Sequence, residues 1–363
     1  MVEFDDLGPE KILEVFNPKV GMRGYLVCDN LALGPGKGGI RMTPSVNMNE
    51  VAKLARAMSY KNAMAELPFG GAKSGIIADD RKITKEKKKE IITAFAEALK
   101  EYCPKLYVAG PDMNTGEEEM GWFSKALKNK KACTGKPKSL GGLPHELGST
   151  GFGVFHSMMS AIEHLNLHKE KLTVAVEGFG NVGWFVSKFL SEHNIKLIGV
   201  SDSKGVIYNR KGLNFNKLDE TKKKTGSVTN YKDGNVLSTS SIISLDADIL
   251  ITAAIPDLIN VSDVNKIKAK LIVEGSNIPM TYETESLLHK KGVLVIPDFV
   301  ANAGGVISSY VEFIGGNKEK MFKMVKEKVI NNTNLVLERP NKAITPRDYA
   351  LKIARERIMK KYK

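Results

Sequence analysis

The 363-residue sequence lacks any apolar run of the roughly 18 residues that a membrane-spanning helix requires. Its first residues, MVEFDDLGPEK, are acidic, whereas a secretory signal peptide opens with a basic segment followed by an apolar one. The three cysteines, Cys28, Cys103 and Cys133, lie far apart and lack the CxxC spacing of a metal or redox site. These absences predict a cytoplasmic protein with reduced, buried cysteines, no membrane segment and no metal site.

Acidic residues are fewer than basic ones, with 41 Asp and Glu against 54 Lys and Arg and a formal net charge of +13. Much of the excess lies in short lysine runs at 82–90, 128–131 and 222–224 and in the final MKKYK. No basic motif with interleaved aromatic residues, of the kind that binds nucleic acid, accompanies these runs. We expect them to be solvated helix faces and loops, and we expect no nucleic-acid partner.

The composition, with 42% apolar and 26% charged residues, is typical of a folded globular protein, and the length fits two domains. From about residue 171, short apolar runs alternate with helical segments at 181–193 and 281–290. The runs are LTVAV (172–176), IKLIGV (195–200), DILIT (248–252), KLIVEG (270–275) and VLVIPD (293–298). This alternation predicts a doubly wound α/β domain with a parallel sheet covered on both faces.

The first half lacks this alternation and is rich in Gly and Pro motifs such as GPGKGG, LPFGGAKSG and VAGPDMNTG. We interpret them as loops shaped around a ligand, the alternative being turns between surface strands. Residues 83–102 have a helical period, with an apolar stripe opposite lysines. We expect an α/β substrate domain over 1–144, a Rossmann-type domain over 145–338, and a C-terminal segment, 339–363, that joins the first domain through a helix at about 346–361.

The predicted strand at 172–176 runs into EGFGNVG, which has the GxGxxG spacing of a dinucleotide-binding turn. The turn comprises Gly178, Gly180, Asn181, Val182 and Gly183. Its glycines permit a tight turn, a close approach of a pyrophosphate and close helix packing, while the helix N-terminus faces the anion. Asp202 follows Gly183 by 19 residues, near the spacing of the acid that binds the ribose hydroxyls. Together these features predict a nicotinamide dinucleotide site rather than a plain glycine turn.

Asp202 favours NAD over NADP because a carboxylate repels a 2′-phosphate. Lys204, two residues further on, could instead bind that phosphate. The sequence therefore predicts NAD or NADP as cofactor, with a preference for NAD.

Three lysines stand beside glycines or in a helix of the first half: Lys37 in GPGKGGIRM, Lys61 in MSYKNA and Lys73 in LPFGGAKSG. Several ammonium groups in one cleft suit a substrate with more than one carboxylate. Crowding of like charges lowers the pKa of at least one lysine, which can then act as a base near neutral pH. Together with Asp112, these three lysines predict a site of acid–base chemistry rather than four separate, exposed charges.

A series of sequence motifs extends over nearly the whole chain. The motifs GPGKGGIRMTPSVN, LPFGGAKSGI, AGPDMNTG, TGKPKSLGG, STGFG, EGFGNVG, VSDSKGVIYN, IVEGSN and PDFVANAGGV follow one another in order. In this the sequence resembles the glutamate, leucine, phenylalanine and valine dehydrogenases. The resemblance implies reversible oxidative deamination of an L-amino acid to a 2-oxo acid and ammonia with NAD or NADP, in a homo-oligomer of six or eight subunits.

The resemblance also implies roles for individual residues. Lys73 is similar to the catalytic lysine that activates water, and Asp112 to the acid that moves a proton to or from the nitrogen. Lys61 is similar to the lysine that holds the α-carboxylate. Thr150, Asn277 and Asn302 match positions that face the nicotinamide end of the cofactor.

The substrate's side chain is indicated by Lys37 and Ser309, which match the lysine and serine that reach the γ-carboxylate in glutamate enzymes. They favour glutamate, because a buried unpaired ammonium would be costly beside an apolar substrate. The length of 363 residues, the short N-terminal segment and AGPDMNTG instead resemble leucine and phenylalanine enzymes. Glu146 falls where glutamate enzymes have arginine, and we interpret the neighbouring His145 as a loop residue.

Two alternatives to a glutamate dehydrogenase therefore stay open. One is a dehydrogenase for branched or aromatic amino acids. The other is a catalytically inactive nucleotide-binding regulator, against which the presence of both Lys73 and Asp112 argues.

Overall fold

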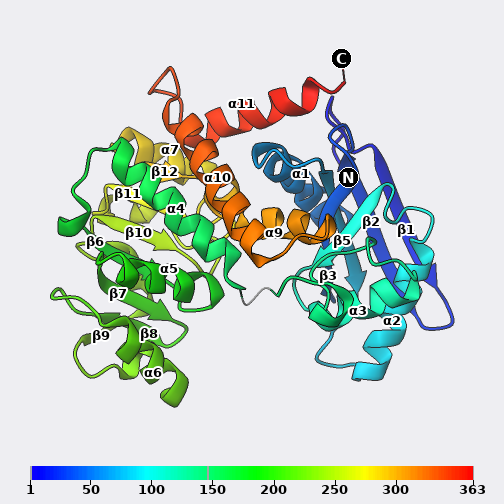
Figure 1. Ribbon diagram of the computed structural model, residues 1–363, viewed down its shortest axis with the longest axis horizontal. Coiled ribbons are helices and arrows are strands. Elements are labelled where there is room, and N and C mark those ends of the chain that lie inside the picture. Colours follow the sequence, from blue (N-terminus) through cyan, green and yellow to red (C-terminus); the bar gives the residue numbers. More distant parts are fainter. Residues whose placement is uncertain (1, 145–146, 363) are drawn as a thin grey trace. The chain divides into compact units, whose positions relative to one another are not determined.

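The computed structural model describes residues 2–144 and 147–362, and the chain folds into two units, each built on its own sheet (Figure 1). The first unit comprises the chain up to residue 147 together with 306–321 and 351–363. The second comprises 148–305 and 322–350. The chain thus returns to the first unit twice, whereas the sequence predicts one return.

The first unit contains a five-stranded sheet in the order β1-β2-β4-β3-β5. Its elements are β1 (Lys11–Asn17), β2 (Met22–Asn30), β3 (Gly36–Thr43), α1 (Met48–Met64), β4 (Gly70–Ile77), α2 (Lys85–Ala98), β5 (Tyr107–Pro111) and α3 (Glu117–Ala126). Strands β1 and β2 form an antiparallel pair, and β3 is parallel to both β4 and β5. Strand β3 lies between β4 and β5, so its side chains lie between those of these two strands.

The glycine-rich motifs that carry Lys37 and Lys73 form strands β3 and β4, which corrects the expectation of loops. Their glycines serve close packing. A Cβ at Gly38 would lie 1.6 Å from the carbonyl oxygen of Ala72, and one at Gly71 would lie 2.1 Å from Ser59 Oγ in α1. Only a residue without a side chain lets β3, β4 and α1 approach so closely.

The first sheet is covered on both faces. Alternate residues of β2 point to opposite sides, with Leu26 in the core shared with α2 and α3 and Val27 in the core shared with α1. The helix expected over 83–102 is confirmed as α2, which buries Ile92 and Phe95.

The second unit contains a seven-stranded sheet in the order β12-β11-β10-β6-β7-β8-β9. Its elements are α4 (Ser149–His164), β6 (Thr173–Glu177), α5 (Asn181–Glu192), β7 (Lys196–Asp202), β8 (Gly205–Tyr208), α6 (Phe215–Thr225), β9 (Asn235–Leu237), β10 (Ile249–Thr252), β11 (Leu271–Glu274), α7 (Tyr282–Lys290), β12 (Leu294–Ile296) and α8 (Asp298–Ala301). All five strands predicted from apolar runs are present and mutually parallel.

The sheet is nevertheless mixed, because β8 and β9 are antiparallel to their neighbours. Only residues 203 and 204 separate β7 from β8, and so short a connection permits only an antiparallel pair. The wholly parallel sheet expected from the sequence is corrected at this edge.

Three further helices follow, α9 (Gly304–Phe313), α10 (Lys318–Leu337) and α11 (Pro346–Met359). Helix α10 ends at Leu337, three residues before Pro340, which cannot continue a helix. All three cysteines are free, and two of them are buried. Among the described residues, no helix combines the length and apolar character that a membrane crossing needs.

Candidate active site

Lys73 and Asp112 form an ion pair in the first unit. Lys73 lies on β4 and Asp112 directly follows β5, and the distance from Lys73 Nζ to Asp112 Oδ1 is 3.0 Å. Arg41 Nε lies 2.8 Å from the other oxygen, Oδ2. The carboxylate of Asp112 is therefore held between two cations.

Burial lowers the pKa of Lys73, although Asp112 opposes this shift. Burial alone would raise the pKa of Asp112, but Lys73 and Arg41 outweigh it and hold that pKa below its usual value. The carboxylate therefore stays charged, and the lysine loses its proton more easily than an exposed lysine, which leaves an amine that can act as a base. This arrangement suits acid–base chemistry.

Sequence reasoning missed Arg41, although it stands inside the motif GPGKGGIRM. Its spacing of four from Lys37 places both side chains on the same face of β3, which was an available signal. Arg41 also donates to Glu50 of α1 at 2.7 Å.

Lys37 is buried, with 3% of its surface exposed, and its Nζ donates to the carbonyl oxygen of Ala109 at 2.7 Å. Burial lowers its pKa to about 7, and the nearby Lys136 and Lys73 contribute in the same direction. The sequence predicts that crowding of lysines lowers the pKa, whereas burial is the larger cause of the shift. A Cβ at Gly110 would lie 2.6 Å from Nζ, so the glycine there leaves room for the ammonium group.

Lys61 and Ser309 also belong to the first unit, and both are half-buried. Lys61 stands in the last turn of α1, and Ser309 lies on α9. The rings of Tyr310 and Phe313 pack edge-on against Phe69, which directly precedes β4, with centroids 5.8 and 5.2 Å apart. These contacts bring the helix of Ser309 to the strand of Lys73.

A buried ion pair that sequence reasoning missed also fixes α9. Glu312 Oε1 lies 2.5 Å from Lys136 Nζ, and its other oxygen accepts from the backbone N–H groups of Gly135 and Leu143 at 3.0 and 2.9 Å. The pair ties α9 to the segment TGKPKSLGG. The available signal was the spacing of Glu312, one helical turn after Ser309.

The glycine turn of the second unit fits a pyrophosphate. Gly178 has a φ of +92°, and a Cβ at Gly183 would lie 2.0 Å from the carbonyl oxygen of Gly178. No atom lies within 4 Å of the Cβ position of Gly180, so the turn is open there. Helix α5 begins at Asn181, and no side chain caps its N-terminus, where Asn181, Val182 and Gly183 form the first turn. Such an end presents backbone N–H groups to an anion.

Asp202, at the end of β7, is held by four donors of its own unit. Oδ2 accepts from Lys222 Nζ at 2.7 Å and from the N–H of Val228 at 2.9 Å. Oδ1 accepts from the N–H of Lys204 at 2.9 Å and from Ser227 Oγ at 3.2 Å. These donors, with Lys222 foremost, outweigh burial and keep the pKa of Asp202 below its usual value.

Asn277 and Asn302 also come together in the second unit, and Thr150 lies near the start of the helix that follows Asn302. Asn302 Nδ2 donates to Asn277 Oδ1 at 2.9 Å, just beyond the carboxyl end of β11. A Cβ at Gly305 would lie 3.2 Å from Thr150 Oγ1, so the first turn of α4 approaches the start of α9. In a doubly wound sheet, ligands bind beyond the carboxyl ends of the strands, where these residues lie.

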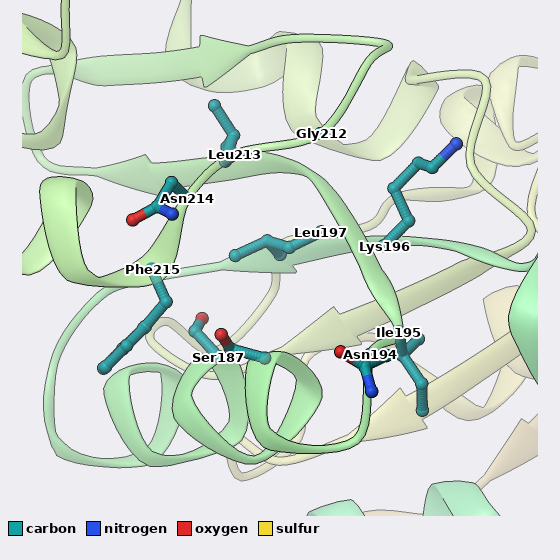
Figure 2. Close-up of a pocket in the computed structure, with 10 residues that line it drawn as sticks. Ser187, Asn194, Ile195, Lys196, Leu197, Gly212, Leu213, Asn214 and Phe215 are labelled. Carbon is teal, nitrogen blue, oxygen red and sulfur yellow. The ribbon is translucent and has the colours of Figure 1, made fainter.

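The second unit also contains a pocket of about 240 Å³ that lies away from the dinucleotide turn. Figure 2 shows Asn194, Ile195 and Lys196 on its wall, and Lys196 begins β7. The glycine turn follows the carboxyl end of β6, whose parallel neighbour is β7. The pocket therefore lies at the amino ends of the parallel strands, whereas the dinucleotide turn lies at their carboxyl ends.

His145 and Glu146, which the sequence analysis singled out, lie outside the described residues.

Comparison with known proteins gives two family matches that together span most of the chain. The Glu/Leu/Phe/Val dehydrogenase dimerisation domain matches residues 9–129, and Glutamate/Leucine/Phenylalanine/Valine dehydrogenase matches residues 141–363.

Individual relatives point the same way. A glutamate dehydrogenase from Aeropyrum pernix is 39% identical over 358 residues, covering 94% of this chain and 86% of that protein. An NADP-specific glutamate dehydrogenase from Saccharolobus shibatae is 35% identical, covering 98% and 89%. Among solved structures, the hetero-hexameric glutamate dehydrogenase from Thermus thermophilus, in a Leu-bound form, superposes with a TM-score of 0.87 at 26% identity, covering 97% and 89%.

Proposed function

Because the chain belongs to the glutamate/leucine/phenylalanine/valine dehydrogenase family, we propose that its substrates are L-glutamate and, in the reverse direction, 2-oxoglutarate and ammonia. The chain is an NAD(P)-dependent amino-acid dehydrogenase. The assignment of glutamate as the substrate rests on Lys37. A buried ammonium group that donates to the carbonyl oxygen of Ala109 and forms no ion pair with a described residue suits a substrate that brings a second carboxylate.

The chemistry divides between the two units. The nicotinamide cofactor, held by the turn at Gly178–Gly183, supplies the hydride chemistry. In the first unit, Lys61 binds the α-carboxylate, and Lys37 with Ser309 binds the γ-carboxylate. Lys73 takes a proton from the water that attacks the imino carbon, and Asp112 then carries the proton of the new hydroxyl group to the departing nitrogen. Arg41 keeps Asp112 ionised between these transfers.

The reaction is tested by following the absorbance of the reduced cofactor at 340 nm with 2-oxoglutarate and ammonium. We expect oxidation that requires both substrates and yields L-glutamate. Oxidation without ammonium, or no turnover of any 2-oxo acid, would contradict the proposal.

Cofactor choice depends on Lys222 in this proposal. Asp202 is already neutralised by Lys222, so a 2′-phosphate would meet a cation as well as a carboxylate. We infer that the enzyme accepts NADP beside NAD, in place of a simple preference for NAD.

Replacing Lys222 with Met should therefore lower kcat/KM with NADP by about tenfold and with NAD by less than threefold, since a charged contact contributes roughly 1.5 kcal/mol or more. Lys223→Met, on the same helix but paired with Asp219, is the matched control and should leave the ratio unchanged. An equal loss with both cofactors would exclude Lys222 from the choice.

Substrate binding should depend on pH through Lys37. With a pKa of about 7, its amine is protonated below pH 7 and largely neutral above it, so binding of a γ-carboxylate at higher pH requires proton uptake. We expect the Kd of glutarate to rise by up to about tenfold per pH unit above pH 7, measured by calorimetry from pH 6 to 9. The dependence should disappear in Lys37→Leu. An affinity independent of pH in the wild type would contradict this role.

We further propose a cytoplasmic homo-oligomer of six or eight subunits. Three free cysteines suit a reducing compartment, and the matched dimerisation domain supports self-association. Light scattering of the purified chain measures the subunit number, and a monomer would contradict the proposal.

A further inference from the structure

Arg347 binds three buried carboxylates in the second unit. It is the second residue of α11, and its NH2 group lies 2.6 Å from Glu274 Oε2 while NH1 lies 3.0 Å from Asp298 Oδ1. Its Nε pairs with Glu285. Its guanidinium also stacks over the ring of Phe299, with Cζ 5.7 Å from the centroid. The planar fork of arginine can satisfy several acceptors at once in this way.

Removing these charged groups from water costs more free energy than is needed merely to hold the start of α11. One cation faces three carboxylates, and the Oε1 atoms of Glu274 and Glu285 are buried without a hydrogen-bond partner. Burial raises the pKa of both glutamates, although Arg347 opposes the shift. Apolar residues of similar volume often give at least equal stability at such positions. A role in fixing geometry explains the cluster better than a role in stability.

The contacts continue from Arg347 to a strained turn beyond β11. The Oε2 atom of Glu274 accepts from the N–H of Asp298 at 2.8 Å, and Asp298 Oδ2 accepts from the N–H of Ile278 at 3.0 Å. Ile278 has a φ of +49°, a left-handed conformation that a β-branched residue rarely adopts. The bond from Asp298 thus helps to hold a turn that would otherwise relax.

That turn carries Asn277, and the same aspartate begins the helix that leads to Asn302. The N–H of Asn302 donates to the carbonyl oxygen of Asp298 at 2.8 Å, and its side chain donates to Asn277. We propose that Arg347 is a positioning residue for the nicotinamide end of the cofactor site, setting the orientation of Asn277 and Asn302 through Glu274 and Asp298. This inference rests on the proposed function, in which both asparagines face the nicotinamide.

The test compares two ligands in Arg347→Lys, which keeps the charge but loses the fork. The ligands are the reduced cofactor that the wild type binds more tightly and its analogue without nicotinamide, ADP-ribose or ADP-ribose 2′-phosphate. We expect the Kd of the reduced cofactor to rise about tenfold and that of the analogue by less than twofold, measured by calorimetry. We also expect kcat to fall by about 10²-fold, the effect of a small misplacement at the reacting centre.

Arg339→Lys is the matched control, because Arg339 is buried in the same unit and donates to the carbonyl oxygen of Ile344. It should leave both dissociation constants unchanged. If Arg347→Lys does not fold, Asp298→Asn should give the same pattern, since one amide oxygen cannot replace two carboxylate oxygens. Equal changes for both ligands, or a lower melting temperature with unchanged binding, would overturn the inference. A wild type that binds no reduced cofactor would instead contradict the proposed function.

Discussion

Replacing Lys73 with Met is expected to lower kcat by at least about 10²-fold, the usual contribution of a positioned acid or base. The fold should survive, because Arg41 remains beside the carboxylate of Asp112 when the lysine is removed. Cofactor affinity should also be unchanged, since Lys73 and the glycine turn belong to different units. Single-turnover kinetics and calorimetry with the reduced cofactor measure the two quantities separately.

Lys88→Met is the matched control for this variant. Lys88 forms a half-buried ion pair with Glu119 at 2.8 Å in the same unit, outside the candidate site. Its loss should affect stability slightly and kcat not at all. A Lys73→Met enzyme that keeps more than a tenth of the wild-type kcat would remove Lys73 from its catalytic role.

The second large effect is expected from Lys37→Leu combined with Ser309→Val. A charge-assisted hydrogen bond contributes about 1.5 to 3 kcal/mol, so each residue should affect kcat/KM for glutamate roughly ten- to a hundredfold. The burial of Lys37 means that leucine enters a site already shielded from water. The double variant should therefore fold and gain weak activity on norleucine.

Ser308→Val separates this effect from a disturbance of α9. Ser308 is the neighbouring serine, whose Oγ lies 3.1 Å from Met321 Sδ. We expect it to keep wild-type selectivity. If the double variant retains glutamate activity, Lys37 and Ser309 do not bind the γ-carboxylate.

The second unit could be predicted closely because its signals are local. The runs around Val174 and Ile272 are continuous, apolar and bounded by turns, and the GxGxxG spacing marks the start of α5. The antiparallel β8 escaped prediction because its direction follows from a two-residue connection rather than from its own pattern. The glycine motifs of the first unit were misread because close packing of strands and loop formation both require glycine.

The candidate site was predictable only in part, for a similar reason. Lys73 and Asp112 stand in recognisable motifs, and the structure places them in an ion pair, while their catalytic roles stay predictions. Glu312 and Arg347 stand far along the chain from Lys136 and Glu274, their partners. The spacing of Glu312 from Ser309 indicates a shared helix face, but no period or spacing connects either residue with its distant partner, so the two pairings required the fold.

The most direct test of the account is the kcat/KM of the wild-type enzyme for 2-oxoglutarate relative to 2-oxohexanoate and phenylpyruvate, with ammonium and reduced cofactor saturating. A buried lysine without a carboxylate partner among the described residues should reject substrates without a γ-carboxylate, so we predict a preference for 2-oxoglutarate of at least about 10³-fold. An equal or higher value for 2-oxohexanoate or phenylpyruvate would contradict the assignment of glutamate and of Lys37 as the residue that selects it.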